Sequence, residues 1–141
     1  MELLNDNMSY STGVPQWSVL GPILFSLFVS SMAQIAIKYG VRQQQYADDT
    51  QLYISISRNN TSQLHDLEDC ILSLFSWFAH NGLFLNPETT DAILFGIYQS
   101  TKSHSNTSNI NVAGTSVALS DKVKLPGVML NRHVTFDSHI M

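Results

Sequence analysis

The sequence contains a single cysteine, Cys70, and few basic residues. One cysteine excludes an intrachain disulfide and any zinc site built from several cysteines, and this usage is typical of an intracellular protein. Seven lysines and arginines stand against eleven acidic residues, which gives a net charge of −4. This balance lacks the basic surface that drives phosphate binding, so we expect no free-standing nucleic-acid-binding protein, although an acidic part of a larger nucleic-acid enzyme would fit.

Leader and membrane signals are also weak. Residues 1–10 contain no positively charged stretch followed by an apolar run, so we expect no signal peptide. The segment from Ser18 to Ile37 is uncharged and long enough to cross a bilayer, but Gly21, Pro22, Gln34 and four serines dilute it. We interpret it as a buried helix. A small single-span membrane protein remains an alternative.

What the sequence does contain is enough apolar material for one domain, since 44% of its 141 residues are hydrophobic. Apolar residues spaced three and four apart predict two helices. The first covers residues 18–39 and ends at Gly40. The second begins at Thr61 or Ser62, either of which can cap it, and ends at Asn81-Gly82. Short strands are predicted at 43–46, 51–57, 92–97, 110–112, 117–119 and 123–130, and in the second of these the apolar residues alternate. A polar loop is predicted at 99–109. This order predicts an α+β fold, with helices packed on a small antiparallel sheet.

Two adjacent carboxylates, Asp48 and Asp49, fall at the expected bend between the first two strands. Neighbouring carboxylates in a tight turn suit a hard cation, because Mg²⁺ is commonly held by one or two carboxylates together with substrate phosphates. Asp also favours turns for conformational reasons, so an Asp-Asp pair is more often an ordinary solvated turn. The pair alone leaves both interpretations open.

Longer segments around this pair resemble reverse transcriptases of non-LTR (LINE-type) retrotransposons. The segments are Gly13-Val14-Pro15-Gln16-Trp17, Tyr46-Ala47-Asp48-Asp49, Leu83-Phe84-Leu85-Asn86-Pro87 and Val123-Lys124-Leu125-Pro126-Gly127-Val128. The first is similar to the family's loop beside the incoming nucleotide and template, and the second to its YADD catalytic hairpin. Their order along the chain makes the resemblance specific, where one short motif would be weak. We interpret residues 1–10 as a lead-in and 11–141 as a partial palm domain.

The resemblance implies an RNA-directed DNA polymerase of a retroelement, in which Mg²⁺ ions assist template-directed nucleotidyl transfer. The implied partners are an RNA template, a DNA primer and a deoxynucleoside triphosphate. Asp48 would be the firmer metal ligand and Asp49 the supporting carboxylate. The residues implied to bind nucleotide, template or primer terminus are Gly13, Pro15, Gln16, Tyr46 and Ala47.

Several positions depart from the family pattern. The family has a further catalytic Asp on a strand ahead of the Gly-Val-Pro-Gln segment, and Asp6 lacks the strand pattern for that role. Trp17 stands where the family has Gly, Thr89 stands where it usually has Lys, and Pro126 interrupts a strand similar to the primer-grip region. We therefore expect this chain alone not to copy nucleic acid. A domesticated, non-catalytic remnant that binds a protein partner is a second alternative.

Overall fold

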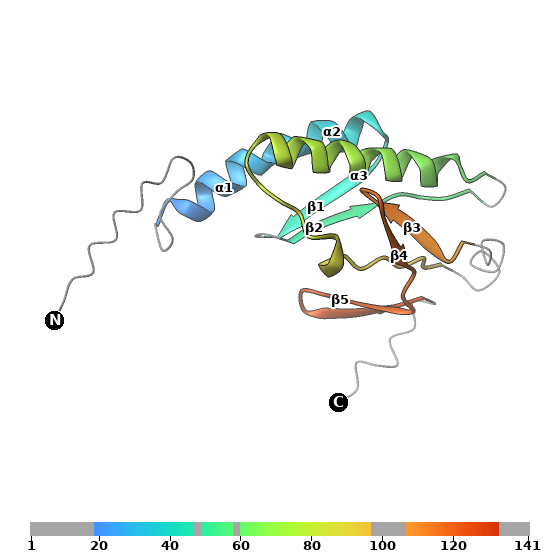
Figure 1. The fold of residues 1–141 in the computed structure, drawn as a ribbon. Coiled ribbons are helices and arrows are strands. Elements are labelled where there is room, and N and C mark those ends of the chain that lie inside the picture. Colours follow the sequence, from blue (N-terminus) through green and yellow to red (C-terminus); the bar gives the residue numbers. More distant parts are fainter. Residues whose placement is uncertain (1–18, 47–48, 58–59, 97–106, 133–141) are drawn as a thin grey trace.

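The computed structural model describes residues 19–46, 49–57, 60–96 and 107–132, which form helices and three separate hairpins (Figure 1). The elements in chain order are α1 Gly21–Ser30, α2 Met32–Lys38, β1 Arg42–Tyr46, β2 Asp49–Tyr53, α3 Ser62–His80, the 3-10 turn η1 Pro87–Thr89, β3 Asn109–Val112, β4 Thr115–Ala118, β5 Lys122–Leu125 and β6 Val128–Asn131. The α+β class is confirmed. In the described residues the antiparallel pairing is divided among β1–β2, β3–β4 and β5–β6.

The core lies where α2 and α3 pack together over the β1–β2 hairpin (Figure 1). Residues four apart on each helix point to the same side, so a stripe of apolar residues is buried on each. The buried cluster consists of Met32, Ala36, Val41, Cys70, Leu74 and Phe78. Leu52 and Ile54, at the end of β2 and just after it, pack against this cluster and hold the hairpin beneath the helices.

The helix predicted over residues 18–39 is divided at Ser31 into α1 and α2. Its end is as predicted, because Gly40 adopts a φ of +67° and the N–H of Val41 donates to the carbonyl of Ala36 at 3.0 Å. The expectation of a buried helix holds for one face of α2, where Met32 and Ala36 are buried, while Ile37 is exposed. It is wrong for α1, whose Ile23 and Leu27 are exposed. By length and composition alone, Gly21–Lys38 could also cross a membrane, and 12% of it is buried here.

The long helix α3 ends as predicted but is capped differently. Gly82, after the C-cap Asn81, has a φ of +73°. At the other end, neither Thr61 nor Ser62 caps with its side chain. Instead, the Oδ1 atom of Asn60 accepts a hydrogen bond of 2.9 Å from the backbone N–H of Ser62.

The second half of the chain departs most from the predicted strands. Residues 92–96 form no strand, and Ala92 makes only an isolated parallel bridge to Leu119. The single strand predicted at 123–130 is two strands, β5 and β6, joined by Pro126-Gly127. Proline fixes φ near the value that the first turn position needs, and Gly127 supplies the positive φ of +79° that follows. Of the polar loop predicted at 99–109, residues 99–106 lie outside the described residues.

Candidate active site

The β1–β2 hairpin carries the predicted catalytic motif. In its antiparallel register, Tyr46 is paired with Asp49 at one end and Arg42 with Tyr53 at the other. Ala47 and Asp48, which join the strands, lie outside the described residues, as do Gly13, Pro15 and Gln16. Of the site residues that the family resemblance implies, the structure therefore describes only Tyr46 and Asp49, which are paired across the two strands.

The two faces of this hairpin differ sharply in composition. Paired residues lie on the same face of a sheet, and the faces alternate along each strand. One face turns toward the helices and carries Gln43, Gln45, Thr50 and Leu52, all half-buried. The other, which we call the open face, carries Arg42, Gln44, Tyr46, Asp49, Gln51 and Tyr53. Tyr46 is 65% exposed there, so both described motif residues are accessible from outside.

The carboxylate of Asp49 suits a hard cation by its chemistry. Carboxylate oxygens are preferred ligands of Mg²⁺, which keeps several waters and shares substrate phosphates instead of requiring a cage made wholly of protein. Asp49 is exposed at the end of the open face, and Asp48 precedes it in sequence. The described part of the chain contains no cluster of three His, Cys, Asp or Glu residues that could hold a metal, so Asp49 supplies part of a site at most.

A groove of about 330 Å³ opens at the other end of the hairpin, where Arg42 and Tyr53 are paired. It lies between the end of α2, the hairpin and the first turns of α3. Its lining residues are Tyr39, Gly40, Arg42, Tyr53, Ile54, Ser55, Gln63 and Asp66. The Oε1 atom of Gln63 is buried without a hydrogen-bond partner. Our sequence reasoning missed this groove, and Arg42 is the signal that could have indicated it, as the one charged residue in β1.

Thr89, which stands where the family usually has Lys, lies in η1. Its hydroxyl donates a hydrogen bond of 3.0 Å to the backbone carbonyl of Asn86, and the side chain of Asn86 in turn accepts from the N–H of Glu88. Thr89 thus closes its own turn and cannot supply the positive charge that the family has at this position.

The match to known proteins covers most of the chain. The family model for reverse transcriptase (RNA-dependent DNA polymerase) matches residues 4–130. Two proteins of Drosophila melanogaster are similar: a probable RNA-directed DNA polymerase from transposon BS is 28% identical over 91% of this chain, and an RNA-directed DNA polymerase from mobile element jockey is 26% identical over 92%. No solved structure matches at a significant level.

The chain spans 14% of the length of each of these two relatives. The resemblance to reverse transcriptases of non-LTR retrotransposons is confirmed. These matches do not favour a small single-span membrane protein or a non-catalytic remnant that acts as a protein-interaction module. The protein belongs to the reverse transcriptase (RNA-dependent DNA polymerase) family.

Proposed function

We propose that this chain is part of the polymerase domain of a retroelement reverse transcriptase and that the β1–β2 hairpin presents its catalytic carboxylates. The observation that carries the proposal is the pairing of Tyr46 with Asp49 at the exposed end of a hairpin that the core holds from its other face. A catalytic carboxylate must meet a large substrate while its backbone stays fixed. A strand packed on one face and open on the other meets both needs.

The proposed reaction joins the primer 3′-hydroxyl oxygen to the α-phosphorus of a deoxynucleoside triphosphate and releases pyrophosphate. Mg²⁺, when bound, would promote loss of the hydroxyl proton and neutralise charge on the leaving pyrophosphate. Asp48 and Asp49 would hold the ions by their carboxylate oxygens. The ring of Tyr46, beside Asp49 on the open face, would contact the sugar of the primer terminus.

The remaining roles are carried over from the family. Gly13, Pro15 and Gln16, with Ala47, would shape the pocket for the incoming nucleotide and the RNA template. Trp17 and Thr89 would weaken that pocket, because one adds bulk and the other lacks a cation. The chain spans 14% of the length of each of its two relatives. We expect the remaining groups of the metal site to come from segments that correspond to the rest of those relatives.

The first test follows the metal site directly. Addition of Mn²⁺ to the isotopically labelled chain should broaden the amide NMR signals of Tyr46 and Asp49 before all other described residues. The double variant Asp48→Asn/Asp49→Asn should lose this selectivity, whereas Asp91→Asn, which also removes an exposed carboxylate, should keep it. Broadening centred elsewhere on the wild-type chain would overturn the assignment of the hairpin as the catalytic site.

The second test concerns the reaction. On an RNA template with a DNA primer and Mg²⁺, we expect the chain alone to add no nucleotide. The same chain within its parent protein should add nucleotides, and Asp48→Asn should abolish that addition. Retained synthesis in the Asp48→Asn parent protein would contradict the role of the hairpin.

A further inference from the structure

We draw no further inference here: the strongest candidate, the apolar surface patch that Leu20, Ile23, Leu24 and Leu27 expose on and just before α1, rests on exposure alone, and nothing in the structure shows what covers it.

Discussion

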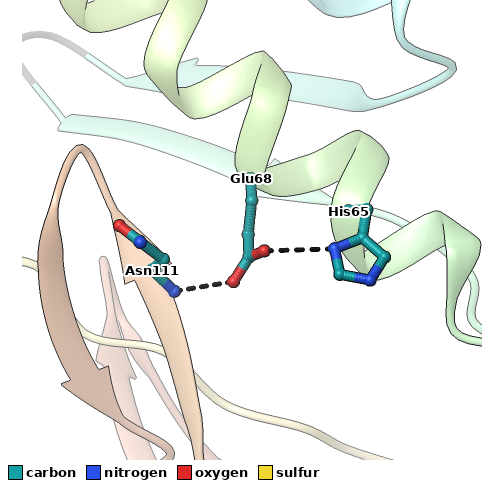
Figure 2. A network of polar contacts seen from close by, with 3 residues as sticks. All are labelled: His65, Glu68 and Asn111. Atoms are coloured by element: carbon teal, nitrogen blue, oxygen red, sulfur yellow. Dashed lines mark hydrogen bonds and ion pairs between the residues drawn. The ribbon is translucent and has the colours of Figure 1, made fainter.

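The carboxylate of Glu68, in the second turn of α3, accepts a hydrogen bond of 2.8 Å from the backbone N–H of Asn111 in β3 (Figure 2). Its other oxygen lies 3.5 Å from the Nδ1 atom of His65, one turn earlier on the helix. The side chain of Asn111 accepts a further bond of 2.7 Å from the N–H of Gly114. One acidic side chain thus joins the helix that covers the candidate site to a hairpin more than forty residues further along the chain.

Removal of this acceptor should loosen the β3–β4 hairpin from α3. Glu68→Ala leaves the Asn111 N–H to water, and we expect a loss of about 1 kcal/mol in the free energy of unfolding, measured with urea. Glu68→Gln keeps a carbonyl acceptor and should cost less. Asp69→Ala is the control, since Asp69 is exposed on the same helix. If Glu68→Ala and Asp69→Ala lower the free energy of unfolding equally, the hydrogen bond from Asn111 to Glu68 does not stabilise the fold.

The turn between β3 and β4 holds a residue in a costly conformation. Ala113 has a φ of +49° and Gly114 a φ of +91°, and a two-residue turn with positive φ at both positions favours Asn-Gly. Ala113→Asn should therefore stabilise the protein by about 0.5–1 kcal/mol in thermal or urea unfolding. Gly114→Ala should destabilise it by about 1 kcal/mol, although no atom lies within 4 Å of the added Cβ. Destabilisation by Ala113→Asn would contradict this account.

The parts of the fold that the sequence predicted well are those fixed by local spacing. The apolar stripe of α3 and the stops at Gly40 and Gly82 follow from helical periodicity and from the need for positive φ. Strands depend on distant partners, which explains why residues 92–96 form only the Ala92 bridge. Pro126-Gly127 was a local turn signal that the alternation of neighbouring apolar residues outweighed.

The candidate site also has features that local sequence predicts and features that depend on distant contacts. The sequence predicted a hairpin around the motif, with Tyr46 at the end of its first strand and Asp49 in the bend. In the structure Asp49 is instead the first residue of β2 and pairs with Tyr46. The open face did not stand out, because the β1 sequence Arg-Gln-Gln-Gln-Tyr carries no apolar alternation to tell one face from the other. Only the packing of Leu52 against the helices decides which residues turn outward, and that contact lies across the fold.

Substitution of a large apolar residue by alanine should lower the free energy of unfolding much more in α2 than in α1. Met32, in α2, is 0% exposed, whereas Leu27, in α1, is 65% exposed. Met32→Ala should cost about 2–5 kcal/mol, because it leaves a cavity in the core, and Leu27→Ala should cost less than about 0.5 kcal/mol in the same urea titration. A large loss for Leu27→Ala in the chain without lipid would mean that α1 is buried in solution and would contradict the exposure seen here.

The thiol of Cys70 should be protected from chemical modification in the folded protein. It is fully buried between α2 and α3, and burial raises the pKa of this thiol above its ordinary value, since a thiolate would lose its hydration. The thiolate is the reactive form. We therefore expect slow modification by a disulfide reagent in the native chain and rapid modification in guanidinium, with no other cysteine to confuse the measurement.

The same burial predicts how stability depends on pH. Because the folded-state pKa is raised, the unfolded chain gives up the Cys70 proton first, so this contribution is complete below the ordinary value and is lost as the pH rises above 9.0. The comparison with Cys70→Ala isolates the contribution of this thiol. The free energy of unfolding of the wild type should fall relative to that of Cys70→Ala as the pH rises above 9.0. Parallel curves for the two proteins would mean that the thiol is solvated in the native state, and α2 would then not be packed on α3 at Cys70.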